Sequence, residues 1–235
     1  MSERRAQTAR RSGRARSQHF LRSTVAAELV RDARVSADDL VLDLGAGTGR
    51  LTAELARAAR RVVAVELDPR LAHRLRGRWE NVAVVEADAR EVELPRERFR
   101  VVANLPFAHT TAILRHLLDD PAVPLVRADL VVEWGVALKR SLPWPSTFND
   151  VVWGAWYSTT LERRLPRAVF QPHPAVDAGV LVVARRPRPL VPEACASDYR
   201  RFVARGFRRG RIALVRKEPR HIDPHEWAQL FARRG

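Results

Sequence analysis

Asn104 and the three residues that follow it have the types and the order that suit chemistry on the exocyclic amine of a flat base. Such an amine is a weak nucleophile because its lone pair is delocalised into the ring. The Asn104 side-chain oxygen and the Leu105 carbonyl can each accept one N–H bond, which draws the nitrogen toward a tetrahedral, more nucleophilic state. Pro106 has a fixed φ and no N–H, so it stiffens the loop, and Phe107 offers a face for an extruded base. Taken alone, the four residues favour an ordinary turn at a strand end.

The weight of this motif depends on a glycine turn upstream. Leu40–Leu44 is a short apolar run, Gly45–Gly49 ends it, and Arg50–Ala59 has helical spacing. Glycines let the backbone approach a ligand closely, and the start of the following helix offers free N–H groups. The G-x-G-x-G spacing suits a dinucleotide or S-adenosylmethionine, and the short loop favours the second, which has no pyrophosphate. A tight turn in some other α/β protein is the alternative interpretation.

Two carboxylates stand at the ends of the next two predicted strands. Glu66 can accept both hydroxyls of a ribose, and Asp88 can accept the adenine amino group. A solvated loop carboxylate would be the better interpretation of Asp88 alone. Both acids, however, fall on the sheet edge where ligands bind in open parallel sheets, and a fourth strand brings Asn104 to the same edge.

The remaining elements follow from apolar spacing and from breakers. Trp153 and Trp156 are expected in the core, whereas Trp144 is open between the core and an aromatic wall for RNA bases. The sequence predicts helices over Val25–Ala33 (with Ser23 and Thr24 as candidate caps), Arg70–Glu80 and Thr110–Leu118, strands over Ala128–Val136 and Ala178–Ala184, an extended loop over Pro166–Val176, and two or three short helices over 196–235.

The net charge of +15 lies entirely in the two ends of the chain. Residues 1–36 carry nine arginines against three acids, residues 185–235 carry fourteen Arg and Lys against five acids, and residues 37–184 carry 19 of each sign. A neutral body with basic ends indicates a polyanion-binding protein, most simply one that binds nucleic acid. A solvated surface in an arginine-biased genome is the alternative.

Several other classes of protein are disfavoured. The one cysteine, Cys195, allows no intrachain disulfide and no cysteine zinc cluster, which suits a reducing cytoplasm. His173 has no partners at metal-ligand spacing, so no metal site is expected. The arginine-rich amino end has no apolar segment after it, and no apolar run approaches a membrane span. No long apolar face is left over, so we expect a monomer.

Taken in order, these motifs resemble the Erm-type rRNA adenine N6-methyltransferases and their KsgA-type relatives, over roughly residues 15–186. The matching motifs are Gln18–Leu21, Asp43–Gly49, Glu66, Asp88-Ala89, Asn104–Phe107 and Phe170–Asp177. The resemblance implies an α/β fold: a Rossmann-like class I S-adenosylmethionine-dependent methyltransferase with a seven-stranded, mostly parallel sheet and a small C-terminal helical domain. We therefore expect a basic arm over 1–16, a catalytic domain over 17–186 and a basic RNA-binding domain over 187–235.

The resemblance also implies the site. Asn104, Leu105, Pro106 and Phe107 would carry out catalysis, and the chain departs from the family at His19, where asparagine is usual. S-adenosylmethionine would be held by His19, Leu21, Gly45, Ala46, Gly47, Glu66, Leu67, Asp88, Ala89 and Asn104. The side chains expected to contact RNA phosphates are those of Arg10, Arg11, Arg14, Arg16, Lys139, Arg140, Arg208, Arg209 and Arg211.

The Phe of the N-L-P-F loop, the short C-terminal part and the arginine-rich arm fit the Erm branch better than the KsgA branch. Erm-type enzymes methylate one adenine of 23S rRNA and so block macrolides, lincosamides and streptogramin B. The alternatives are a KsgA-like 16S rRNA dimethyltransferase, a DNA adenine methyltransferase and a non-catalytic RNA-binding assembly factor.

Overall fold

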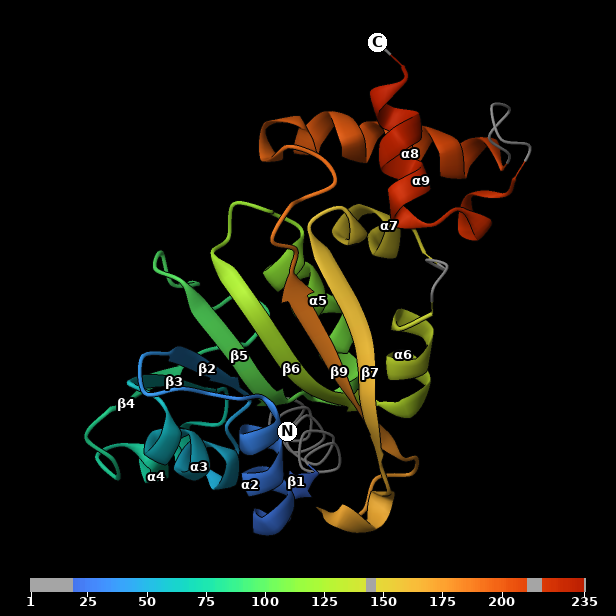
Figure 1. Cartoon of the computed structure of the whole chain (residues 1–235). Helices are drawn as coiled ribbons and strands as arrows, with labels where there is room; N and C mark the ends of the chain where they lie inside the picture. Colours follow the sequence, from blue (N-terminus) through green and yellow to red (C-terminus); the bar gives the residue numbers. More distant parts are fainter. Residues whose placement is uncertain (1–18, 143–146, 211–216, 235) are drawn as a thin grey trace, which may run out of the picture.

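The computed structural model describes residues 19–142, 147–210 and 217–234, and its main element is one seven-stranded sheet (Figure 1). In spatial order the strands are β4 (Val82–Glu86), β3 (Arg61–Glu66), β2 (Leu40–Leu44), β5 (Phe99–Asn104), β6 (Leu125–Glu133), β9 (Ala178–Arg185) and β7 (Tyr157–Leu165). The first five are parallel to one another, and β9 runs antiparallel to both of its neighbours. The strand order reverses between β2 and β5, which is where open α/β sheets bind ligands.

Helices cover both faces of the sheet because successive strand residues point to opposite sides. Val41 and Val102 pack in a cluster with α2 (Ser23–Asp32) and α3 (Arg50–Ala58). Their strand neighbours Leu42 and Val101 pack in another cluster with α5 (Thr110–Leu118), α6 (Trp134–Arg140) and α7 (Phe148–Gly154). The fully buried strands therefore read as nearly continuous apolar runs, as expected for a parallel sheet with two covered faces.

A second, two-stranded sheet lies at the carboxyl ends of the parallel strands. β1 (Phe20–Leu21) pairs antiparallel with β8 (Phe170–Gln171), which follows the short helix η2 (Arg167–Val169). This ribbon joins the amino end of the described chain to the loop that precedes β9, and it places His19 beside Asn104 at the end of β5.

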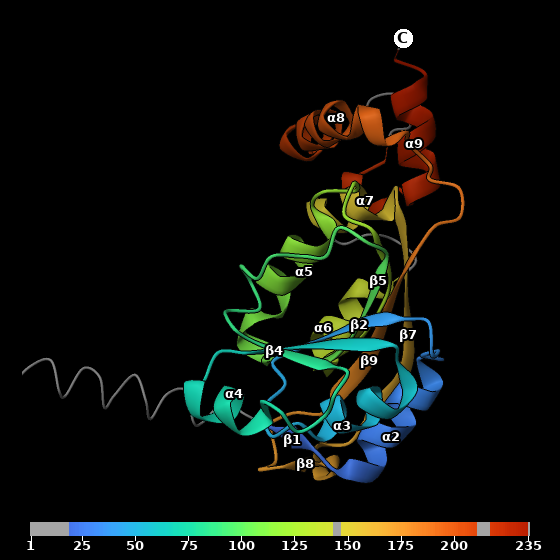
Figure 2. The ribbon, with the colours of Figure 1, turned by 90° about the vertical axis from the view of Figure 1, so that its left-hand side faces the viewer.

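The C-terminal helices lie at the other end of the sheet, beyond the amino ends of the parallel strands (Figures 1 and 2). α8 (Ala196–Arg209) follows the short helix η3 (Glu193–Cys195), and α9 (Pro224–Ala232) follows η4 (Pro219–His221). Tyr199 and Trp227 are fully buried and belong to the same apolar cluster as Trp153 and Trp156. Trp153 and Trp156 are thus core residues, as predicted. Trp144 lies outside the described residues.

Several predicted boundaries were wrong for local reasons. The helix expected over Arg70–Glu80 is α4 (Pro69–Leu75), which stops before Gly77 at φ +72°. Neither Ser23 nor Thr24 caps α2, because the capping position is Arg22 and its side chain makes no capping bond.

The strand expected to reach Val136 ends at Glu133, where α6 begins. From the residue pattern, α7 and β7 were not predicted at all: β7 is an edge strand whose side chains alternate between exposed and half-buried. None of the described helices is long and apolar enough to cross a lipid bilayer.

Candidate active site

The candidate catalytic loop, Asn104–Phe107, begins where β5 ends, at Asn104. The N–H of Leu105 donates to the Val131 carbonyl of β6 at 3.0 Å, and the Leu105 side chain is buried. The Asn104 side-chain N–H donates to the His19 carbonyl at 2.6 Å. Its Oδ1 is buried and has no hydrogen-bond partner among the described residues. Because a buried acceptor without a partner is costly, this oxygen is the atom that a ligand N–H would satisfy.

Aromatic rings stand beside this acceptor. The Phe107 ring lies 6.1 Å from the His19 ring, tilted by 43°, and 6.4 Å from Phe170 in an edge-on arrangement. The His19 Nδ1 lies 3.0 Å from the Pro172 carbonyl, so a ring N–H there donates to it. The structure therefore brings His19 to the Phe107 side of the loop, and its backbone orients the Asn104 amide.

The glycine turn is folded against the end of β3. The N–H groups of Gly45 and Ala46 both donate to the Val65 carbonyl, at 2.8 and 3.0 Å. Gly47 has φ +57°, and a Cβ there would lie 2.6 Å from the Phe20 ring. Only glycine fits this position, and without a side chain the backbone there is accessible to a ligand. The same edge of the sheet also carries carboxylates. These residues fit the adenosyl part of S-adenosylmethionine.

Glu66 fixes the same turn. Its Oε2 accepts from the Gly47 N–H at 2.7 Å and its Oε1 from the Asp68 N–H at 2.8 Å. The residue is only 5% exposed, yet each oxygen keeps a further lone pair for a ribose hydroxyl. Two other residues expected at the donor site differ from each other: Leu21 is buried in β1, whereas Leu67 is 41% exposed.

Asp88 has a partner that the sequence pattern did not indicate. Its carboxylate accepts from the Arg90 backbone at 2.9 Å and from two nitrogens of the Arg90 guanidinium. The Arg90 side chain lowers the pKa of Asp88 to about 2, so the carboxylate is ionised at neutral pH. Ala89 beside it is buried in the core. A contact of Asp88 with adenine would share the carboxylate with Arg90.

Asp43 opens the glycine motif, but no role of its own was predicted for it from the sequence. It is buried in β2, two residues before Gly45, and accepts from the Thr52 hydroxyl at 2.6 Å. Burial raises its pKa to about 7, and Glu66 nearby adds to the rise. The only signal in the sequence was an acidic residue inside the otherwise apolar run Leu40–Leu44, which is the usual mark of a polar group with a specific partner.

The basic residues predicted to bind RNA fall into two groups. Lys139 is exposed on α6, and Arg208 and Arg209 are exposed at the end of α8. Arg140, in contrast, forms an ion pair with Asp150, and both side chains are 10% exposed, so its guanidinium is turned into the protein. The residues Arg10, Arg11, Arg14, Arg16 and Arg211 lie outside the described part of the chain.

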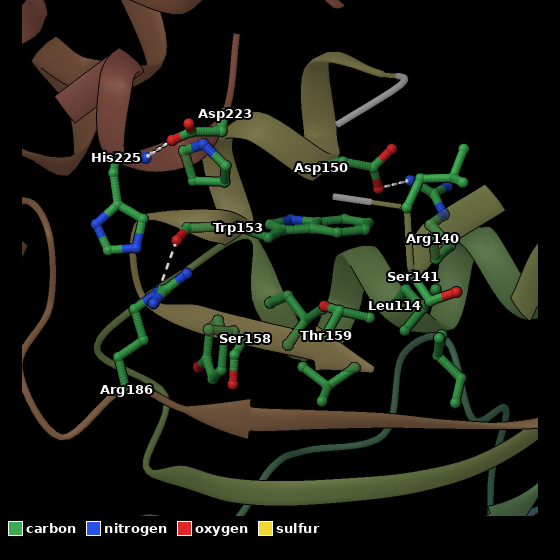
Figure 3. A pocket seen from close by; sticks show the side chains of 17 residues that line it. Leu114, Arg140, Ser141, Asp150, Trp153, Ser158, Thr159, Arg186, Asp223 and His225 are labelled. Carbon is green, nitrogen blue, oxygen red and sulfur yellow. Dashed lines mark hydrogen bonds and ion pairs between the residues drawn. The ribbon is translucent and has the colours of Figure 1, made fainter. Parts of the chain in front are cut away.

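Arg140 and Asp150 line a cavity of about 260 Å³ between the amino end of α9 and the sheet (Figure 3). The Trp153 ring lies across it, held by a bond from its N–H to Asp119 at 2.9 Å. Arg186 donates to the Gly154 carbonyl at 2.9 Å on the opposite wall. This cavity lies where β7 begins, at the end of the sheet away from Asn104, so it is not part of the candidate active site.

The fold and the site together define a class I methyltransferase: the strand order, the glycine turn and the polar loop after β5 all meet at one edge. The chain belongs to the ribosomal RNA adenine dimethylase family, whose model matches residues 11–230. Together with the relatives described next, this match confirms the expectation of an rRNA adenine N6-methyltransferase of the Erm type. Membership of the family implies S-adenosylmethionine as methyl donor and rRNA as substrate.

Three comparisons illustrate the match. The mycinamicin-resistance protein MyrB of Micromonospora griseorubida is 38% identical over 81% of this chain and 68% of its own length. An rRNA adenine N-6-methyltransferase of Corynebacterium diphtheriae is 34% identical over 79% of this chain and 75% of its own. The crystal structure of the 23S rRNA methyltransferase ErmE superposes with a TM-score of 0.75 and 28% identity, covering 91% of this chain and 98% of the other.

Proposed function

We propose that the protein transfers a methyl group from S-adenosylmethionine to N6 of one adenine of 23S rRNA and thereby gives resistance to macrolides, lincosamides and streptogramin B. The observation that carries this proposal is the Asn104 Oδ1, which is buried, has no partner among the described residues and is oriented by the His19 carbonyl. The names of the relatives support it: one is a mycinamicin-resistance protein, one an rRNA adenine N-6-methyltransferase and one a 23S rRNA methyltransferase. A single cysteine and a ribosomal substrate fit a protein of the cytoplasm.

The chain's own residues would act on the target base. Bound S-adenosylmethionine would supply an electrophilic methyl group. The Asn104 Oδ1 and the Leu105 carbonyl would accept the two N–H bonds of the amine, so that its lone pair leaves conjugation and attacks the methyl carbon in line. The bond from that carbon to the donor sulfur would break, and S-adenosylhomocysteine would leave. Phe107 stacks on the extruded base, and Pro106 holds the loop rigid. The methylated amine is acidic and loses its proton to water or to the loop, so no strong base is required.

The donor would be held by the turn and the strand tips. Gly45, Ala46 and Gly47 provide the close backbone approach, Glu66 takes the ribose hydroxyls, and Asp88 takes the adenine amine. Leu21, Leu67 and Ala89 complete this site in our proposal, and the His19 backbone links it to Asn104.

RNA would be bound by the arm over 1–16 and by the helical part over 187–235. Lys139, Arg208 and Arg209 are exposed and support this proposal, whereas the buried ion pair of Arg140 does not. Asn104 is the last residue of β5, and the carboxyl end of that strand and α8 lie toward opposite ends of the sheet (Figure 1). A substrate that reaches both must span roughly 30 Å, the length of the nine-residue strand β6.

The test is transfer of labelled methyl from S-adenosylmethionine to protein-free 23S rRNA, with 16S rRNA in small subunits as the parallel substrate. Label at a single adenine of 23S rRNA supports the proposal, and a digest gives the ratio of mono- to dimethyladenine. Label in 16S rRNA alone would move the protein to the KsgA branch. Donor binding without label would leave an assembly factor. Size-exclusion chromatography would test the expected monomer.

A further inference from the structure

A second hollow lies at the catalytic edge of the sheet, one strand beyond the Asn104 loop. It has a volume of about 380 Å³ and is bordered by the end of β6, the end of β7 and the loop before β9. Asn104 pairs with Val131 of β6, and Glu133 at the rim of the hollow lies two residues further along that strand, about 7 Å away by strand rise. The hollow is therefore a near neighbour of the place proposed for the target adenine.

One wall of this hollow is formed by Arg164, whose guanidinium plane is fixed by two neighbouring side chains. The Arg164 guanidinium lies over the Trp134 ring at 4.9 Å from its centroid. Its Nε donates to Asp177 Oδ2 at 2.9 Å, and Nη2 lies 2.7 Å from the same oxygen. The Arg164 side chain is nevertheless 58% exposed. A guanidinium fixed by a ring on one side and a carboxylate at its edge presents its other face to solvent, and such a plane stacks well on an unstacked base.

The Trp134 ring cannot move away from this arginine easily. A Cβ on Gly179 of β9 would lie 3.2 Å from the ring, so glycine allows the tryptophan to pack directly on the strand. The backbone N–H of Trp134 also donates to the backbone carbonyl of Asp177 at 2.9 Å. Asp177 therefore fixes both members of the stacked pair.

Two further charges face the same hollow. The Arg167 N–H donates to Asp177 Oδ1 at 2.8 Å, and the Arg167 side chain is exposed, where it can take a phosphate. Glu133 precedes α6 and makes no capping bond with its side chain. Its carboxylate can accept from the exocyclic amine of a base, as carboxylates do from cytosine. The rim of the hollow therefore offers a flat guanidinium for stacking, a cation for a phosphate and a hydrogen-bond acceptor for a base.

We propose that this hollow binds the nucleotide next to the target adenine in the RNA strand, with its base on the Arg164–Trp134 pair, its phosphate on Arg167 and its amino group on Glu133. The inference rests on the proposed function and adds a site that reads the neighbour of the methylated base. Because uracil has no exocyclic amine, the site prefers adenine, cytosine or guanine over uracil at that position.

The test is a cycle between protein variants and abasic RNA. A short 23S-derived hairpin that contains the target adenine carries one abasic nucleotide at each neighbouring position in turn, and methyl transfer is measured as kcat/KM. With the unaltered protein, one position should lose about five- to a hundredfold when abasic. Arg164→Ala should lose a similar factor on intact RNA and nothing more on that abasic RNA.

Arg164→Lys guards against a folding defect, because lysine keeps the charge opposite Asp177 but lacks the plane. This variant should have the melting temperature of the unaltered protein. Its kcat/KM should nevertheless be the same on intact RNA and on RNA that is abasic at the neighbouring position. Arg167→Gln should raise KM without changing kcat, whereas Arg60→Gln, an exposed arginine paired with Glu97 near the start of β3, should change neither. Equal abasic losses in the unaltered protein and in both Arg164 variants would overturn the inference. No transfer to the intact hairpin or to 23S rRNA by the unaltered protein would instead contradict the proposed function.

Discussion

The side-chain amide of Asn104 donates to the backbone carbonyl of His19 over 2.6 Å, although 85 residues separate them. The bond decides which end of the amide faces the site: the N–H side is occupied by the chain itself, so the oxygen is left for a ligand. It also ties the ribbon of β1 and β8 to the catalytic loop. Correct placement of residues 19–21 and a reactive Asn104 therefore depend on each other.

Replacement of Asn104 should separate transfer from donor binding. Asn104→Ala removes one of two acceptors for the target amine, so we expect kcat on 23S rRNA to fall by about 10²-fold or more, the loss typical of a missing positioned hydrogen-bond partner. Single-turnover transfer measures the rate, and calorimetry measures S-adenosylmethionine affinity, which should stay nearly unchanged.

Asn104→Asp sharpens this prediction. The aspartate keeps an acceptor but places a carboxylate oxygen against the His19 carbonyl in place of an N–H donor. We expect it to be as inactive as the alanine variant, with a lower melting temperature than that variant. Transfer at the normal rate by either variant would refute the role assigned to Asn104.

Gly47 and Gly77 form a matched pair for testing the donor site. Both have positive φ, at +57° and +72°, but a Cβ on Gly47 would lie 2.6 Å from the Phe20 ring, whereas a Cβ on Gly77 meets nothing within 4 Å. Each alanine variant carries the cost of a left-handed backbone, about 1–2 kcal/mol. Gly47→Ala should in addition abolish donor binding by calorimetry, because it displaces Phe20 and the Glu66 bond. Loss of donor binding in both variants would show that backbone strain alone is responsible.

Asp43 should make stability depend on pH in a defined window. Its pKa is about 7 in the folded protein, against an ordinary value of 3.8 for an aspartate, so the folded state retains the proton. The contribution to the free energy of unfolding is complete below about pH 4, declines as pH rises, and is lost above about pH 7. Asp43→Asn cannot ionise and can still accept from Thr52.

Urea unfolding of both proteins without donor, between pH 4 and 8, measures this effect. The free energy of unfolding of Asp43→Asn relative to the unaltered protein should increase with pH, by at most about 1.4 kcal/mol per unit. Parallel curves would mean that Asp43 is ionised throughout. The opposite contributions of Asp39 and Asp88, whose pKa values are lowered, are common to both proteins and cancel.

The parts of the site that the sequence predicted are those set by local order along the chain. Glycines directly after Leu44 and acids at strand ends must meet at one edge once the strands are parallel, so Gly47 and Glu66 could be placed in advance. The missed features depend on contacts across the fold. Nothing near Asn104 in the sequence indicates the His19 carbonyl, and nothing near Asp88 distinguishes Arg90 from a solvated arginine. Arg140 was assigned to RNA by its charge, and only the position of Asp150 shows that it is buried.

Lys139 and Arg140 test this last distinction, because they are adjacent, basic and differently placed. Arg140→Gln leaves the Asp150 carboxylate buried without its cation, so the free energy of unfolding should fall by about 3–5 kcal/mol. Lys139→Gln removes an exposed charge, so stability should stay the same. RNA affinity, measured as a function of salt, should show the reverse pattern.

For Lys139→Gln, the negative slope of log affinity against log salt should become shallower by about 0.7, the value for one phosphate contact on a single strand. For Arg140→Gln, measured at a temperature where the variant is folded, the slope should match that of the unaltered protein. A reduced slope in Arg140→Gln would mean that the ion pair with Asp150 opens on RNA binding and that Arg140 then reaches a phosphate.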